Sequence, residues 1–208
     1  MVRVPKEKLS ASKVQLDAHV ATLVKVAQAL RDARGAGADR AWLARALTEA
    51  IKYHWEIPNA SGFRIGTQFW SGWLWSPDAR GLYEENGGSG LSGMLVKEHV
   101  MPKNLYASEF LESQMSVADA ASWLNEHSVI AVVAKVRYRS SKSDDELLRP
   151  FKSRLPHEGD DWWKGEVAAG RQRDLDDPWN RYRAVGLDPD RFQPLHQSAE
   201  WAAVGRRK

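Results

Sequence analysis

The sequence predicts a helix-rich α+β protein that folds as a single domain over residues 1–208, with an N-terminal helical hairpin and a small sheet in its middle section. Near the N-terminus, apolar residues recur at intervals of three and four positions, as on one face of an amphipathic helix. A run rich in β-branched residues begins only at residue 129, which favours a sheet further along the chain. The hydrophobic fraction of 43% is enough for a buried core.

The helical hairpin is predicted over residues 11–54. Its first helix, 11–33, has an apolar stripe formed by Leu16, Val20, Leu23, Val24, Ala27 and Leu30. Ser10 or Ser12 can cap the start of this helix, and glycines end it. Asp39 can cap a second helix over 40–54, which we expect to end at Pro58.

Residues 55–152 are predicted to form a mixed core that holds the candidate site. Between 59 and 76, aromatic residues alternate with glycines, which fits either short strands or an irregular segment. Helices are expected from Pro77 to about residue 83–86, over 103–114 and over 117–127, with a short one between Ser143 and Pro150. The strongest predicted strand runs from Val129 to Tyr138.

Residues 153–208 differ in composition, because they are rich in Arg, Asp, Pro and Trp and poor in aliphatic residues. We expect this segment to wrap the domain and to be partly irregular, with one short helix from Trp179 to Val185. Its arginines suggest a cationic patch that nearby aspartates offset; they are Arg171, Arg173, Arg181 and Arg183.

Composition excludes several classes of protein. The chain has no cysteine, so disulfides and thiolate metal sites are impossible. The first ten residues lack the apolar stretch of a signal peptide, and the longest apolar run, Val129 to Ala134, is too short to span a bilayer. We therefore expect a cytoplasmic protein with no membrane partner. The net charge of +3 is a mild basic excess, and the oligomeric state stays open.

One short motif carries possible chemistry. The sequence Glu98-His99-Val100-Met101-Pro102 resembles the first half of the HNH, or ββα-metal, nuclease motif. The resemblance implies a nuclease in which Glu98 binds a divalent metal and His99 is the general base that activates water. It also implies a helical metal ligand about two dozen residues later, which would be His127, with Asn125 as an alternative. The metal would be Mg²⁺, Mn²⁺ or Zn²⁺.

The chain departs from that family in several respects. The strand expected before Glu98 is only three or four residues long, and no Asn stands at the family's middle position, because Asn104 is too close to Pro102. Residues 103–114 read as a helix, where the family has a loop and a second strand. An exposed Glu-His pair followed by a helix that starts at proline is also an ordinary structural feature. The motif therefore supports two interpretations, a catalytic one and a structural one.

A second feature favours binding without catalysis. Alternation along the predicted strand places Lys135, Arg137 and Arg139 on one face, with Lys142 just beyond, and such a face suits a phosphate backbone. The alternative function is therefore a non-catalytic nucleic-acid- or protein-binding module that uses these cations and the tryptophans. A solvent-facing strand explains the same cations without any function. A third possibility is a small-molecule or sugar site formed by the aromatic residues 69–75.

Overall fold

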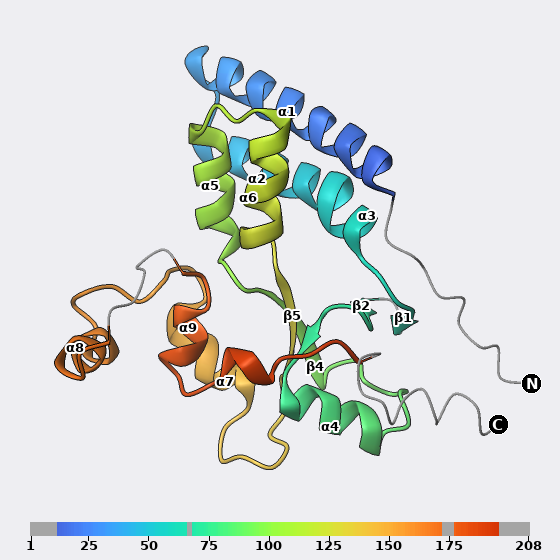
Figure 1. The fold of residues 1–208 in the computed structure, drawn as a ribbon, viewed down its shortest axis with the longest axis vertical. Coiled ribbons are helices and arrows are strands. Elements are labelled where there is room, and N and C mark those ends of the chain that lie inside the picture. The colour runs from blue at the N-terminus through green and yellow to red at the C-terminus, as the bar shows by residue number, and fades with distance from the viewer. Residues whose placement is uncertain (1–11, 66–67, 172–176, 196–208) are drawn as a thin grey trace, which may run out of the picture. The chain divides into compact units, whose positions relative to one another are not determined.

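The computed structural model of the chain describes residues 12–65, 68–171 and 177–195, without the side chains of residues 104 and 106. It confirms the helix-rich α+β class, the N-terminal helical hairpin and the small sheet (Figure 1). The residues group into two compact units. The helical unit comprises 12–60 and 101–129, and the sheet unit comprises the described residues of 61–100 and 130–195. The chain therefore leaves the sheet unit after residue 100 and returns to it at residue 130.

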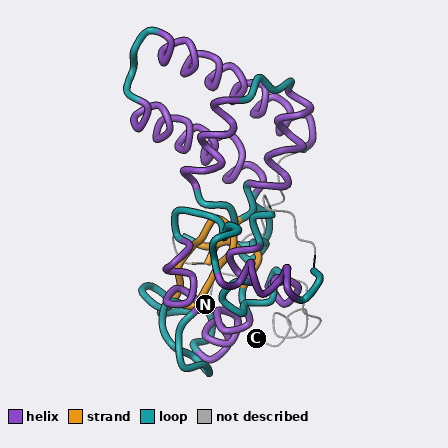
Figure 2. Tube along the Cα trace, turned by 90° about the vertical axis from the view of Figure 1, so that its left-hand side faces the viewer, coloured by secondary structure: helices purple, strands orange, loops and turns teal. Residues whose placement is uncertain are grey.

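Helices make up almost all of the helical unit (Figure 2). Its elements are α1 (Lys13–Gly35), α2 (Arg40–Ile51), the π-helix η1 (Lys52–Glu56), α3 (Ile57–Asn59), α5 (Lys103–Glu112) and α6 (Val117–His127). Helices α2, α5 and α6 all pack against α1. The buried side chains come mainly from these four helices and form one core, which includes Val20, Leu23, Leu43, Leu47, Phe110, Leu111 and Leu124.

Local sequence explains where these helices start. Ser12 forms a capping box with Gln15 at the start of α1, which satisfies backbone N–H groups that have no partner inside the helix. Asp39 caps α2 by accepting a hydrogen bond from the Trp42 N–H at 2.8 Å. The predicted end of the second helical segment at Pro58 agrees with the structure to within one residue. Helical structure continues without a break through η1 and α3 and ends at Asn59, one residue past Pro58.

The sheet unit mixes strands, helices and loops. Its strands are β1 (Arg64–Ile65), β2 (Phe69–Trp70), β3 (Leu74–Trp75), β4 (Leu95–His99) and β5 (Ile130–Ala134). Its helices are α4 (Pro77–Glu85), α7 (Asp144–Leu148), η2 (Arg149–Phe151), α8 (Asp161–Ala168), α9 (Asn180–Arg183) and η3 (Pro189–Arg191). The segment 59–76 thus contains short strands, and helix α8 has no counterpart in the sequence prediction.

Strand β5 is the centre of a three-stranded sheet with the order β3-β5-β4. It runs parallel to β3 and antiparallel to β4, where Glu98 lies opposite Ala131. All five residues of β5 are buried, as expected for a central strand. The predicted strand over 129–138 was therefore too long. Lys135, Arg137 and Arg139 lie in a loop beyond the strand, so their alternation does not place them on one face of the sheet.

The described part of segment 153–208 contributes α8, α9 and η3, and then pairs with the sheet. The backbones of Gln193 and Trp75 exchange two hydrogen bonds, and the Leu195 N–H donates to the Ser71 carbonyl at 2.9 Å. Trp75 is fully buried and makes edge contacts with Phe69 and Tyr83. Residues 196–208 of the predicted wrapping segment lie outside the described part. Within that part, no helix combines the length and the apolarity needed to cross a membrane.

The side chain of Arg181 links three elements of the sheet unit. Its guanidinium donates to the carbonyl oxygens of Phe151, at 3.0 Å, and His99, at 2.9 Å. It also donates to the Glu98 carboxylate at 3.1 Å, although only 1% of the Arg181 side chain is exposed. This arginine therefore ties α9 to the end of β4 and to η2. A buried guanidinium is tolerated where carboxylate and carbonyl oxygens replace the water that it loses.

We expect Arg181→Met to lower the free energy of unfolding by about 3 kcal/mol or more, because it leaves the Glu98 carboxylate without its cation. Urea denaturation followed by circular dichroism measures this loss. The matched control is Arg149→Ala, which removes an exposed arginine and should cost about 0.5 kcal/mol or less. Equal losses in the two variants would contradict the role given to Arg181.

Candidate functional site

The Glu98–His99 motif lies at the end of strand β4 in the sheet unit. The strand is five residues long and antiparallel to β5, so Glu98 and His99 point to opposite sides of the sheet. His99 is buried, with 6% of its surface exposed. The Glu98 side chain is 15% exposed and is held by Arg181. In this arrangement the Glu98 carboxylate serves as the partner of a buried cation.

His127 and Asn125 lie in the helical unit, at the end of α6. The Nδ1 of His127 lies 2.9 Å from the Trp123 carbonyl, which can only accept, so Nδ1 carries the proton. The imidazole also stacks on the Trp123 ring, with centroids 4.6 Å apart. Asn125 is exposed and donates to the Ala121 carbonyl at 3.0 Å. Histidine at this position also complements the negative end of the helix dipole when it is protonated.

The donors proposed for a metal thus come from both units, Glu98 from one and His127 from the other. Among the residues that the structure describes, no group of three or more His, Asp or Glu side chains is placed to hold a metal ion. The site implied by the HNH resemblance therefore stays a prediction. Sequence reasoning did not find Arg181 as the partner of Glu98, because 83 positions separate the two residues and neither follows a recognisable motif.

The predicted basic residues lie together on the loop 135–143, which follows β5 and which we call the basic loop. The side chains of Lys135, Arg137, Arg139 and Lys142 are all exposed. Arg137 forms an ion pair with Glu146 at 3.3 Å, and Arg139 lies 3.6 Å from Glu85. Both arginines are more than 60% exposed, so these pairs are weak and leave donors available. No described carboxylate forms an ion pair with Lys135 or Lys142.

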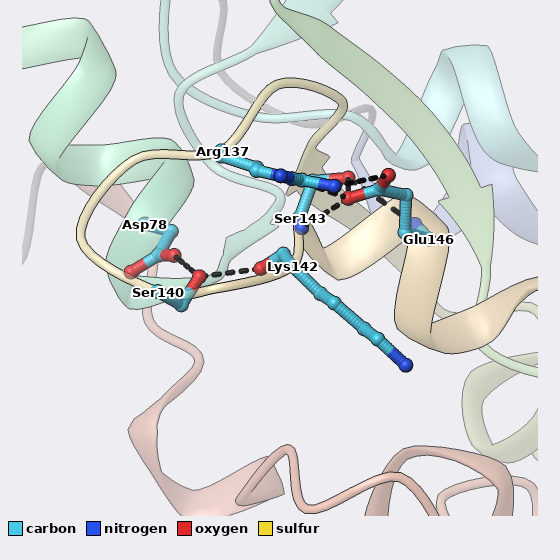
Figure 3. A network of polar contacts seen from close by, with 6 residues as sticks. All are labelled: Asp78, Arg137, Ser140, Lys142, Ser143 and Glu146. Carbon is cyan, nitrogen blue, oxygen red and sulfur yellow. Dashed lines mark hydrogen bonds and ion pairs between the residues drawn. The ribbon is translucent and has the colours of Figure 1, made fainter.

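Hydrogen bonds connect the basic loop to α4 and α7 (Figure 3). The Ser140 hydroxyl contacts the Asp78 carboxylate at 3.2 Å and the Lys142 carbonyl. Ser143 caps α7 in a capping box with Glu146, and the side chain of Lys142 points away from this network (Figure 3). At the other end, the Lys135 N–H donates to the Met94 carbonyl at 2.8 Å.

Tyr138 anchors the middle of the basic loop to helix α4. Its hydroxyl donates to the Glu85 carboxylate at 2.6 Å, and this contact raises the pKa of Tyr138. The ring packs so closely on Gly81 that a Cβ atom there would lie 2.3 Å from it. Glycine at position 81 is therefore required for this packing. The tyrosine is occupied by these contacts, so the exposed groups that the loop offers to a partner are its cations.

The side chain of Asp144 binds the last residue of β5, where the basic loop begins. This side chain is 3% exposed and accepts hydrogen bonds from the Ala134 N–H, at 2.9 Å, and from the Ser76 hydroxyl. Burial raises the pKa of Asp144, which the two hydrogen bonds oppose. Asp144 therefore lies in the first turn of α7 and also joins this helix to the sheet and to the start of α4.

A pocket of about 460 Å³ contains Trp162, Arg171 and Arg183. It does not offer free positive charge, because Glu166 binds Arg171 through two hydrogen bonds and Asp177 binds Arg183. The predicted C-terminal cationic patch is therefore neutralised at these two arginines and buried at Arg181, while Arg173 lies outside the described residues. The aromatic residues 69–75 also belong largely to the core, since Phe69 and Trp75 are buried.

We expect the basic loop to loosen in acid through Glu146. A hydrogen bond from the Ser143 N–H, followed by the contact with Arg137, lowers the pKa of Glu146 from 4.5 to about 2. A lowered carboxyl pKa contributes stability that is present above the unfolded value and is lost as the pH falls towards the folded one. Between pH 5 and 2, the wild type should therefore lose more stability than Glu146→Gln in urea denaturation. Glu158→Gln, in an exposed turn, is the control and should follow the wild type.

Comparison of the chain with family models, with curated proteins and with solved structures finds no match in any of the three. Two features of the chain itself bear on its function: the exposed basic loop, and the Glu98–His99 motif with its buried arginine partner.

Proposed function

We propose that this protein binds nucleic acid through the phosphate backbone, with the basic loop as the contact surface. The observation that carries the proposal is the placement of four exposed cations, Lys135, Arg137, Arg139 and Lys142, on one short loop. Phosphate contacts come mainly from lysine and arginine side chains and require local clusters rather than a high net charge. The net charge of +3 is compatible with such a local surface.

Rigidity of the loop supports this proposal. Binding through a mobile segment loses conformational entropy, whereas a loop already held in place loses less. The basic loop is fixed by Ser140, Tyr138 and the capping box at Ser143. Its two arginine pairs are exposed, and a phosphate can replace Glu85 or Glu146 at small cost, because surface ion pairs contribute only about 0–1 kcal/mol.

Hydrolysis of the bound nucleic acid is a second proposal, which rests on the Glu98–His99 motif. One observation favours it: Glu98 and His99 end a true strand, β4, as the first strand of the ββα-metal motif requires. Helices α5 and α6 stand between β4 and β5, where the motif has a loop and a second strand, and this order weighs against it. The ion pair of Glu98 with Arg181 also weighs against it, because a metal would have to compete with that arginine for the carboxylate. We therefore rank hydrolysis below binding.

The binding proposal is tested by fluorescence anisotropy with a labelled 20-base-pair DNA duplex at several salt concentrations. Replacing Lys135, Arg137, Arg139 and Lys142 with alanine should weaken binding and flatten the salt dependence. The slope of log K against log salt should fall by about 0.9 for each phosphate that the variant no longer neutralises, up to about 3.6 for four phosphates. No binding by the wild type at low salt would refute the proposal.

The matched control removes four exposed cations of the helical unit, which gives the same change in net charge. These are Lys13, Lys25, Arg40 and Arg45. Their replacement by alanine should leave most of the slope intact, because the proposal assigns the phosphate contacts to the basic loop. An equal decrease of the slope in both variants would mean that net charge, and not the basic loop, governs binding.

The hydrolysis proposal is tested by cleavage of plasmid DNA in the presence of Mg²⁺ or Mn²⁺. His99→Gln should abolish cleavage, because glutamine cannot take a proton from water, while near-ultraviolet circular dichroism checks that the buried site stays folded. Glu98→Gln keeps an acceptor for Arg181 and should reduce metal-dependent activity. His157→Ala, at an exposed histidine, is the control. Full activity of folded His99→Gln, or no cleavage by the wild type, would reject this proposal.

A further inference from the structure

Two histidines of the helical unit face each other across neighbouring helices. His19 lies on α1 and His54 lies on the π-helix η1, which packs against α1. Their Nδ1 atoms are 3.3 Å apart, and their rings are tilted by 52° with centroids 5.6 Å apart. Both side chains are half-buried, so water and small ions can reach them.

Buried neighbours fix the backbone on both sides of this pair. Val20 and Leu23 anchor α1 in the core next to His19, and Trp55 does the same for η1 next to His54. The N–H of Ile57 donates to the carbonyl of Lys52, which is the wider spacing of a π-helix. Such π turns occur frequently at functional sites. The positions of the two imidazoles are therefore set by the core, and not by the contact between them alone.

The distance between the two nitrogens matches that of two ligands on one tetrahedral ion. Zinc binds imidazole nitrogen at about 2.0–2.1 Å, so two nitrogens at a tetrahedral angle lie about 3.3–3.4 Å apart. The other explanation is a direct hydrogen bond between the rings. At 3.3 Å between the two nitrogens, such an N–H···N bond would be a long one, and the metal-binding experiment below separates the two explanations.

We propose that His19 and His54 together bind one divalent transition-metal ion, such as zinc, through their Nδ1 atoms. Two neutral imidazoles favour zinc, nickel or copper over Mg²⁺ and Ca²⁺, which prefer oxygen ligands. The described residues contain no group of three or more candidate ligands, so water completes the coordination and the site is open. The bound ion links α1 to η1. It is independent of nucleic-acid binding, because the basic loop belongs to the other unit.

The experiment is a titration of the full chain with zinc chloride, followed by calorimetry and by the nitrogen chemical shifts of the histidine side chains. The wild type should bind one equivalent, with shifts at His19 and His54, and its melting temperature should rise with zinc but not with magnesium. His19→Ala and His54→Gln should each weaken binding at least tenfold and remove the thermal shift. His157→Ala, in the sheet unit, should behave as the wild type does.

Each result decides for or against the site. Zinc binding that survives unchanged in both folded variants, or that is abolished equally in His157→Ala, overturns the proposal. So does a wild type that binds no zinc while its two histidine signals stay unshifted, which would leave a direct hydrogen bond as the explanation of the pair. If one variant fails to fold, the other still tests the site, because His19 and His54 lie on different helices.

Discussion

The ion pair between Arg181 and Glu98 is the interaction on which the sheet unit depends most. Only 1% of the Arg181 side chain is exposed, so its guanidinium must find acceptors inside the protein. It finds them on β4 and η2, so one side chain sets the position of three elements. Its Nε is buried without a hydrogen-bond partner, which makes the other contacts more important. Tyr182 beside it is also fully buried, which raises the pKa of Tyr182 to about 12, and its ring keeps this region closed to water.

The sheet unit contains two kinds of charged side chain, which differ in their exposure. The Arg181 and Asp144 side chains are buried, the Glu98 side chain is largely buried, and each contacts named partners, so their function is to hold elements together. The cations of the basic loop are exposed and only weakly paired, so they are available to an external anion. A binding function follows more directly from the second group than a catalytic function follows from the first. The same comparison explains why a short motif such as Glu-His-x-x-Pro needs its surroundings before it indicates chemistry.

Much of the helical structure was predictable because its signals are local. Serine and aspartate caps, apolar spacings of three and four residues, and glycines after the last turn indicate α1, α2, α4 and α6 within a few residues. The errors lie where local signals compete with packing. Residues 135–139 have the composition of a strand, but β5 ends at Ala134, where the Asp144 carboxylate accepts the hydrogen bond of the Ala134 N–H. Nothing near residue 134 in the sequence reveals a carboxylate ten positions later as its partner.

The sequence by itself determined the helix-rich class, the hairpin, the central β-branched strand and the clustering of four cations near residue 139. It determined these because each depends on residues that are neighbours along the chain. Only the tertiary structure decided that Glu98 pairs with Arg181, that His19 faces His54, and that the chain passes through the helical unit between β4 and β5. Each of these features depends on contacts between residues that are tens of positions apart in the sequence. They form because burial of apolar surface brings distant segments together, and that process leaves no periodic signal in the sequence.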